Sequence, residues 1–473
     1  MSIICTARPS AIAAILGLSI LQAASPGAAA AQPAGSASLQ VAVDYYKLGN
    51  GLKVVLSRDT TTPTAVVAVY YHIGFRNEPK DRTGFAHLFE HMMFQGSKNL
   101  GKMEFIKLVE SNGGLLNGST RFDFTNYFQV VPSHVVETIL WAEADRMRGL
   151  QITQDNLKNQ QEVVKNEVKV NVLNQPYGGF PWIDLPMAAN SNWYNAHNFY
   201  GDLAHLDAAT LADVDAFFKT FYAPNNAVLV VTGDFEPAAT KGWIEKYFAT
   251  IPAAKLPAPP DLAEPRQEKE KRAGRTDPLA NRPAIGLGYH VPPRNTPEWY
   301  AFGLLDQLLG QGQDSLLYDE LVRKRALTGS VDAGINRGLG SMFDYSGPML
   351  WVAQIFRDTS TPSDTVVEAV DAVITRVQLQ GVDQATLDRA LVKMRSSLYA
   401  GIEQFAGFGR ANLLASFALF DDNPTRINQL EAEFARITPA LLQKTAVEYL
   451  RPTNRTVYLI TPGKAEPAPG AKK

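Results

Sequence analysis

A proline-rich and charged segment divides this sequence of 473 residues into two stretches that repeat one order of elements. Residues 253–282 combine prolines with a run of charges, a composition typical of an extended, solvated linker. Strand and helix patterns alternate before this segment, and a similar order returns in residues 283–463. We therefore predict an α+β protein with an internal duplication, whose first unit spans residues 40–252.

In the first unit, apolar residues follow the period of a strand in some segments and the period of a helix in others. Asn50-Gly51 is a turn signal between two strand patterns, which predicts a hairpin. Further predictions include a strand in residues 63–74, a helix in 84–94, a helix in 102–114, one long strand in 115–131 and a helix in 156–173.

The N-terminus reads as a cleaved secretory signal, residues 1–31. Arg8 precedes a short apolar run, and small residues follow up to the expected cleavage site near Ala31. The alternative is an uncleaved membrane anchor. No later segment has about 18 consecutive apolar residues, so we expect a mature chain with no membrane span, exported to the bacterial periplasm. Residues 464–473 are predicted to form a flexible tail.

Cysteine usage and net charge exclude several classes of protein. Cys5 is the only cysteine and lies in the predicted signal, so the mature chain would have no disulfide, no cysteine nucleophile and no thiolate metal ligand. With 45 basic and 47 acidic residues the formal charge is −2, and there is no basic arm. Nucleic acid is therefore not an expected partner.

The stretch TGFAHLFEHMMFQGS, residues 83–97, contains His87, Glu90 and His91 in the order H-x-x-E-H. On a helix, residues three and four apart share a face, so the two imidazoles can bind one zinc ion. Zinc lowers the pKa of a bound water, and a nearby carboxylate can accept the proton. Glu90 has the right position for that base.

The alternative is a polar helix face without a ligand. Leu88 and Phe89 lie among these residues, so the helix is largely apolar, and charge on a buried helix requires a partner. A metal would be such a partner. A third ligand must come from elsewhere. Glu167 lies at the edge of the apolar side of the predicted helix 156–173, but taken alone its context is that of a solvated residue.

The chain resembles the inverzincin zinc metallopeptidases of the pitrilysin–insulysin family. The resemblance rests on the stretch GFAHLFEHMMFQGS, on the spacing of Glu167, and on the segments NGGLLNGSTRFDFTNY and LLGQGQDSLLYDELVRKRALTGSV. The resemblance covers most of residues 43–462 and is strongest to the zinc-bearing subunit of the mitochondrial-processing-peptidase subfamily. It implies two homologous α/β-roll halves, each an antiparallel-rich mixed sheet covered by helices. It also implies an endopeptidase with one zinc ion on His87, His91 and Glu167, and Glu90 as general base.

The resemblance further implies that a peptide substrate adds as a strand to the edge near residues 115–119. Asn117 would contact the substrate most directly, beside Leu116 and Gly118, although Asn117 could equally be a turn residue. Family members often have a glutamate seven residues before the third ligand, where this chain has Gln160. Its amide could still hydrogen-bond a ligand histidine.

A second departure concerns the arginine and tyrosine that, in members acting alone, hold the substrate carbonyl. Here Val322 and Gly329 occupy those positions, and Arg323 and Arg325 are out of register. We therefore expect a heterodimer in which a homologous subunit supplies the Arg/Tyr pair, with a homodimer as the alternative. The two subunits would enclose a chamber for peptides and unfolded small proteins. The competing function is a non-catalytic scaffold or peptide-binding subunit of the same fold.

Overall fold

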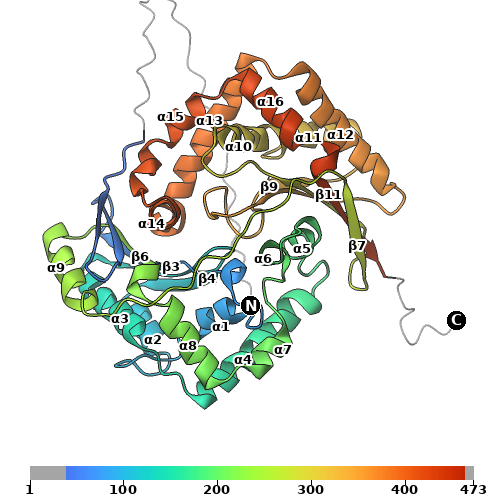
Figure 1. Ribbon diagram of the computed structural model, residues 1–473. Coiled ribbons are helices and arrows are strands. Elements are labelled where there is room, and N and C mark those ends of the chain that lie inside the picture. Colours follow the sequence, from blue (N-terminus) through green and yellow to red (C-terminus); the bar gives the residue numbers. More distant parts are fainter. Residues whose placement is uncertain (1–38, 464–473) are drawn as a thin grey trace, which may run out of the picture. The chain divides into compact units, whose positions relative to one another are not determined.

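The structure is a computed structural model that describes residues 39–463, in which helices pack on the faces of two sheets (Figure 1). The predicted signal peptide, residues 1–31, and the predicted tail, residues 464–473, lie outside the described residues. Among the residues that are described, no helix is both long and apolar enough to cross a lipid bilayer. The α+β class predicted from the sequence is confirmed.

The first sheet has six strands in the order β1-β2-β6-β3-β5-β4. They are β1 (Asp44–Lys47), β2 (Lys53–Arg58), β3 (Thr64–Tyr71), β4 (Leu115–Thr120), β5 (Thr125–Pro132) and β6 (Ala227–Gly233). Only β2 and β6 pair in parallel, and the other pairs are antiparallel. Strands β3 and β6 lie in the middle and are almost wholly buried, as their continuous Val-rich sequences predict. Strand β4 lies at the open edge.

The second sheet repeats the topology of the first with one strand fewer. Its order is β7-β11-β8-β10-β9, in which β7 and β11 are parallel and the other pairs antiparallel. The strands are β7 (Lys271–Asp277), β8 (Ala284–His290), β9 (Val331–Ile335), β10 (Leu350–Phe356) and β11 (Arg455–Pro462). Strand β9 therefore corresponds to the edge strand β4. The same order and directions are what an internal duplication predicts.

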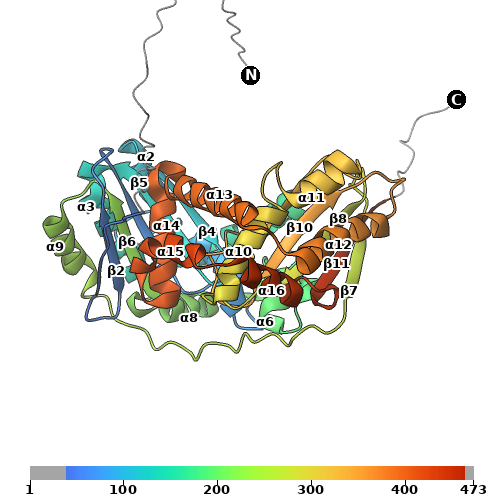
Figure 2. The ribbon, with the colours of Figure 1, turned by 90° about the horizontal axis from the view of Figure 1, so that it is seen from above.

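The prediction of a linker over residues 253–282 was too long, because Lys271–Asp277 form β7. This edge strand is rich in charged residues, which are common on strand edges and resemble a solvated segment in sequence. Arg275, for example, pairs with Asp184 at 3.0 Å. The stretch before β7 has no helix or strand and runs along the outside of the molecule from the first sheet to the second (Figure 2).

The prediction of one long strand over residues 115–131 was also wrong, because the chain turns back at residues 121–124 to form the β4–β5 hairpin. The Arg121 N–H donates to the Phe124 carbonyl at 2.8 Å, which closes the turn. Gly74 makes room for the turn, since a Cβ there would lie 2.3 Å from the Arg121 carbonyl oxygen. A tertiary contact of this kind leaves no signal in the local apolar pattern.

Helices from the first stretch cover one face of the first sheet (Figure 1). They are α1 (Phe85–Met92), α2 (Glu104–Ser111), α3 (Val136–Arg148), α4 (Gln154–Val168) with its π-helical extension (Lys169–Leu173), α7 (Leu203–Ala208), α8 (Leu211–Phe221) and α9 (Pro237–Phe248). The second sheet is covered by α10 (Pro297–Leu309), α11 (Leu316–Tyr318) with its π-helical extension (Asp319–Lys324), α12 (Ser363–Gln380), α13 (Gln384–Ile402), α15 (Leu430–Ala435) and α16 (Pro439–Tyr449).

The other face of the first sheet is covered by α14 (Gln404–Asp421), a helix from the second stretch. Phe408 of α14 stacks on Phe128 of β5 with ring centroids 3.7 Å apart. Further along the helix, the Tyr70 hydroxyl of β3 donates to Asn412 Oδ1 at 2.8 Å. Figure 1 shows α14 directly above β3 and β6.

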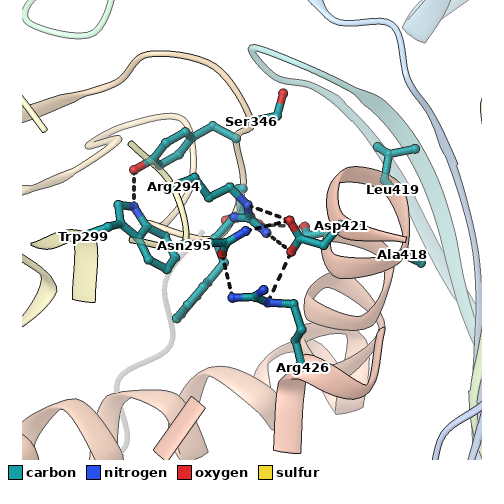
Figure 3. Close-up of polar contacts among 12 residues, drawn as sticks. Arg294, Asn295, Trp299, Ser346, Ala418, Leu419, Asp421 and Arg426 are labelled. Carbon is teal, nitrogen blue, oxygen red and sulfur yellow. Dashed lines mark hydrogen bonds and ion pairs between the residues drawn. The ribbon is translucent and has the colours of Figure 1, made fainter. Parts of the chain in front are cut away.

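A polar cluster ties the C-terminal end of α14 to the rest of the second stretch (Figure 3). The Asp421 carboxylate accepts hydrogen bonds from Arg294 and Asn295, each at 2.9 Å, and lies 3.6 Å from Arg426 Nε. Arg426 also donates to Asn295 Oδ1 at 2.9 Å. Because both Arg294 and Asp421 are largely buried, this cluster holds α14 firmly while its apolar side covers the first sheet.

Each stretch contributes a helix to the sheet of the other. While α14 covers the first sheet, α5 (Asp184–Ala189), from the first stretch, packs on β7, β8 and β11 of the second sheet. Gly288 accommodates it, since a Cβ there would lie 3.0 Å from Leu185 Cδ2. The short helix α6 (Trp193–Ala196) follows. One continuous core therefore contains residues of both stretches, and the two predicted halves are not separate bodies.

A fully buried ion pair also joins the two stretches. Arg76 Nε lies 3.6 Å from Asp123 Oδ1, and both side chains are at most 1% exposed. Arg76 Nη2 donates to the Pro348 carbonyl, and the Ser346 N–H donates to Asp123 Oδ2, both at 2.8 Å. Arg76 lies in the loop before α1, and Asp123 lies in the β4–β5 turn.

We expect Asp123→Ala to lower the free energy of unfolding by about 3–5 kcal/mol, because it leaves the Arg76 charge buried without a partner. The measurement is urea denaturation of the single variants and of Arg76→Met with Asp123→Ala. The double variant should lose less stability than the sum of the two single changes. Additive losses would show that the two side chains are not energetically coupled.

Candidate metal centre

Helix α1 begins at a glycine and is capped by a buried carboxylate. Gly84 has φ of 84° and lies close to Tyr200, whose carbonyl oxygen would be 2.6 Å from a Cβ at this position. Glu78 Oε2 accepts from the Gly84 N–H at 2.8 Å, and Oε1 accepts from the Ala86 N–H at 2.5 Å. Glu78 thus satisfies amides that are otherwise free at a helix N-terminus.

Sequence reasoning missed Glu78, although an acidic residue shortly before a helix start is a recognisable signal. Its side chain is fully buried, and burial raises its pKa. His197 Nε2, 3.8 Å away, and the two backbone amides act in the opposite direction. Glu78 thereby fixes the position of the first turn of the helix that carries the H-x-x-E-H residues.

The structure brings His87, His91 and Glu167 together from α1 and α4. Their candidate ligand atoms all lie within 4.8 Å of one another. The two imidazole Nε2 atoms are 3.3 Å apart, and the Glu167 oxygens lie 3.6 Å from His87 Nε2 and 3.1 Å from His91 Nε2. Two nitrogens bound to one tetrahedral zinc at about 2.0–2.1 Å lie roughly 3.3–3.4 Å apart. The donor set therefore fits a divalent metal ion.

The surroundings favour the protonation states in which these side chains bind metal. His87 is buried beside Phe199 and Tyr200, and burial together with the His91 charge lowers its pKa to about 4. The pKa of Glu167 is lowered, chiefly by its hydrogen bond with His91. The Tyr200 hydroxyl also donates to Glu167 Oε1 at 3.3 Å. His87 is thus neutral and Glu167 ionised at neutral pH.

Glu90 lies beside the candidate ligands and is held by the end of β4. Its Oε2 accepts from the Thr120 hydroxyl at 2.7 Å. Gly118 leaves room for it, since a Cβ there would lie 3.3 Å from Glu90 Cγ. Burial raises the pKa of Glu90, while the Thr120 hydrogen bond and the charges of His91 and Arg121 lower it. A buried carboxylate whose pKa is raised is suited to proton transfer.

The predicted contact of Gln160 with a ligand histidine is not made. Gln160 is buried, but its Nε2 donates to Asn159 Oδ1 at 2.8 Å, because the adjacent residue offers an acceptor within hydrogen-bond distance. His87 Nδ1 is buried and has no hydrogen-bond partner among residues 39–463. The ring of His87 is therefore oriented by its aromatic neighbours.

His87, Glu90 and Glu167 border a cleft of about 310 Å³. It is lined by His87, Glu90, Asn117, Gly118, Ser119, Thr120, Arg121, Glu167, Trp182, Phe199, Tyr200, Gly338 and Leu339. Of the three predicted substrate contacts, Asn117 and Gly118 line the cleft but Leu116 does not. Leu116 is on the same side of β4 as Gly118, and its side chain packs against the core under the sheet.

Thr120, Arg121 and the aromatic wall of the cleft were not predicted. The aromatic residues come from the segments GGFPWIDL and HNFYGD, whose clustered aromatic and glycine residues are the only signal in the sequence. From the second stretch only Gly338 and Leu339 reach the cleft. Val322, Gly329, Arg323 and Arg325 do not line it, and Arg323 instead lies over the Tyr318 ring.

Two family models match the chain. Residues 53–177 match the model described as Insulinase (Peptidase family M16), and residues 208–394 match the model described as Peptidase M16 inactive domain. The candidate ligands and Glu90 all fall in the first match. The second match covers most of the second stretch, which brings only Gly338 and Leu339 to the cleft.

Relatives with curated names and solved structures agree with these matches. A zinc protease of Helicobacter pylori, PqqE, is 26% identical over 420 residues, which is 88% of this chain and 92% of that protein. The crystal structure of a protease from Helicobacter pylori has a TM-score of 0.81 at 25% identity and covers 89% of this chain and 100% of that one. The periplasmic protease PqqL from Escherichia coli has a TM-score of 0.72 at 18% identity, covering 90% of this chain but 48% of that one.

The chain is thus similar to the zinc proteases of peptidase family M16, the insulinase and pitrilysin type. Its fold is that of the M16 two-domain peptidases. The subfamily stays a prediction.

We expect Glu167→Gln to lower zinc content from about one ion per chain to well below that, because it removes one of three protein ligands. The measurement is metal analysis after dialysis against buffered zinc. Glu162→Gln, an exposed change on the same helix, is the matched control and should leave the zinc content unchanged. Full zinc occupancy in Glu167→Gln would show that this carboxylate is not a ligand.

Proposed function

We propose that this chain is the zinc-bearing subunit of an endopeptidase, with His87, His91 and Glu167 as ligands. The observation that carries the proposal is the convergence of these three donor atoms beside Glu90, in a cleft bordered by an open sheet edge. Residues 40–252 would form the metal-binding half and residues 283–463 its homologous partner half. The zinc-protease relatives support the choice of metal.

A bound zinc ion would supply Lewis acidity, lowering the pKa of water and polarising the scissile carbonyl. Glu90 accepts the proton of the attacking water and delivers it to the leaving amine. The hydrogen bond from Thr120 keeps one Glu90 oxygen engaged, which orients the other toward the cleft. Trp182, Phe199 and Tyr200 form an aromatic wall beside these residues.

Strand β4 supplies the surface on which a peptide would be held. It pairs only with β5, so its other edge is free to hydrogen-bond an extended chain. Asn117 is exposed on this strand and borders the cleft. A peptide added here would run past Thr120 and Glu90, which brings a backbone carbonyl to the metal ligands.

We infer that the active form is a dimer that encloses the cleft. The second stretch contributes only Gly338 and Leu339 to it, and the chain spans 48% of the periplasmic protease from Escherichia coli. A homologous subunit with an Arg/Tyr pair would complete the site, and a second copy of this chain is the alternative. The enclosed chamber would admit peptides and unfolded small proteins. The predicted export signal and that periplasmic relative favour the periplasm.

The second candidate function is a scaffold or peptide-binding subunit that does not cut. The match of residues 208–394 to an inactive-domain model favours it. The candidate ligands lie outside those residues, which is why we prefer the peptidase. Hydrolysis separates the two functions.

We expect the zinc-loaded full chain, with its partner where one is required, to hydrolyse quenched fluorogenic peptides. Glu90→Gln should lower kcat by about 10²–10⁴-fold, because it removes the general base while leaving the zinc ligands intact. Zinc content, measured on the same samples, should not change. Peptide binding without turnover in the unaltered protein would instead favour the non-catalytic subunit.

The subunit arrangement predicts how activity depends on concentration. For a heterodimer, the specific activity of this chain alone should be low and independent of its concentration, and should rise when the homologous chain is added. A homodimer should give a specific activity that rises with concentration and parallels the dimer fraction measured by light scattering. Full activity in a sample that is monomeric throughout would contradict both arrangements.

A further inference from the structure

Among residues 39–463, Arg121 is the only lysine or arginine that lines the cleft of the candidate metal centre. Within residues 39–463, it forms no ion pair with any carboxylate. Its Nη1 donates to the Thr120 carbonyl at 2.9 Å, and this is the one hydrogen bond of its guanidinium group in the described part of the chain. A guanidinium has five N–H donors, so most of them are available to a ligand.

The backbone of Arg121 is held rigidly, so its side chain starts from a fixed point. Its N–H donates to the Phe124 carbonyl at 2.8 Å, and its own carbonyl accepts from the Phe75 N–H at 3.2 Å. The missing side chain of Gly74 permits this close approach. The same loop leads through Glu78 into α1, which places Arg121 and the H-x-x-E-H residues in one rigid frame.

Arg121 lies where a bound peptide would pass the reacting centre. It directly follows Thr120, the last residue of β4, which holds Glu90. Ser119 and Asn117, two and four residues earlier, also border the cleft. An extended peptide on the β4 edge would therefore meet Arg121 within a few residues of the bond beside Glu90.

Charge determines which peptide side chain Arg121 can recognise. Without it, a carboxylate entering the cleft would meet Glu90 and Glu167 and be repelled. A guanidinium binds carboxylates through two parallel, charge-assisted hydrogen bonds, and it discriminates strongly against neutral amides of the same shape.

We propose that Arg121 is a specificity-determining residue that binds an aspartate or glutamate side chain of the substrate, close to the scissile bond. This inference rests on the proposed peptidase function. It assigns Arg121 to the substrate side chain, and it leaves proton transfer to Glu90.

The test uses pairs of quenched peptides that differ only by Glu or Gln, with the variable residue moved through the three positions on each side of the cleaved bond. At one position the unaltered full chain should cleave the Glu peptide about tenfold faster in kcat/KM. In Arg121→Gln that ratio should fall to about one, while the rate for the Gln peptide changes little. Arg121→Glu should instead favour the corresponding Lys peptide. Arg323→Gln, outside the cleft, is the matched control and should keep the tenfold ratio.

Two results would overturn the inference while the peptidase function stands. The first is equal cleavage of Glu and Gln peptides at every position by the unaltered chain, or a preference that survives in Arg121→Gln. The second is an equal loss for all peptides in Arg121→Gln, which would assign Arg121 to a backbone carbonyl. If no peptide is cleaved, the proposed function fails separately. In that case, fluorescence anisotropy measures the binding of the same peptides. Selective binding of the Glu peptide that is lost in Arg121→Gln supports the inference, and equal binding of the Glu and Gln peptides overturns it.

Discussion

The buried ion pair of Arg76 and Asp123 is the constraint on which the cleft depends. Arg76 lies in the loop that leads into α1, and Asp123 lies in the turn that ends β4. The same two side chains accept or donate hydrogen bonds at Ser346 and Pro348 of the second stretch. Burying two charges is costly, and a well-packed apolar pair would often be as stable. The pair is better understood as fixing one arrangement of the segment before α1, the β4–β5 turn and residues 346–348. The first segment leads into the helix that carries Glu90, and the turn follows Thr120, the hydrogen-bond partner of Glu90.

The part of the site that could be predicted from the sequence is the part that one helix specifies. His87, Glu90 and His91 share a face because the helical period puts them there. Glu167 is on another helix, and only the family resemblance singled it out. Glu78 and Thr120 act across tertiary contacts, so no local period reveals them. Gln160 shows the converse: the family spacing predicted a contact with a ligand histidine, but the Gln160 amide donates to Asn159 instead.

The fold, like the site, could be predicted from the sequence only in part. Apolar periods indicated most strands and helices, and their order indicated the repeat. They could not indicate that α14 covers the first sheet and α5 the second. An amphipathic pattern predicts that one face of a helix is buried, but it does not indicate which element packs against that face. The errors at β7 and at the β4–β5 turn have the same origin. A charged edge strand resembles a linker, and the turn depends on the space at Gly74 and on the buried Asp123, which lies 49 residues further along the chain.

The exchange of helices bears on how the site can be completed. Since α14 and α5 lock the two stretches into one core, the second stretch cannot swing freely to close over the metal centre of the first. Its contribution to the cleft is limited to Gly338 and Leu339, which are apolar or lack a side chain. The second stretch therefore supplies no side chain that could hydrogen-bond the substrate carbonyl. The hydrogen-bonding side chains that line the cleft all come from the first stretch, and within the described residues Arg121 is the only lysine or arginine among them.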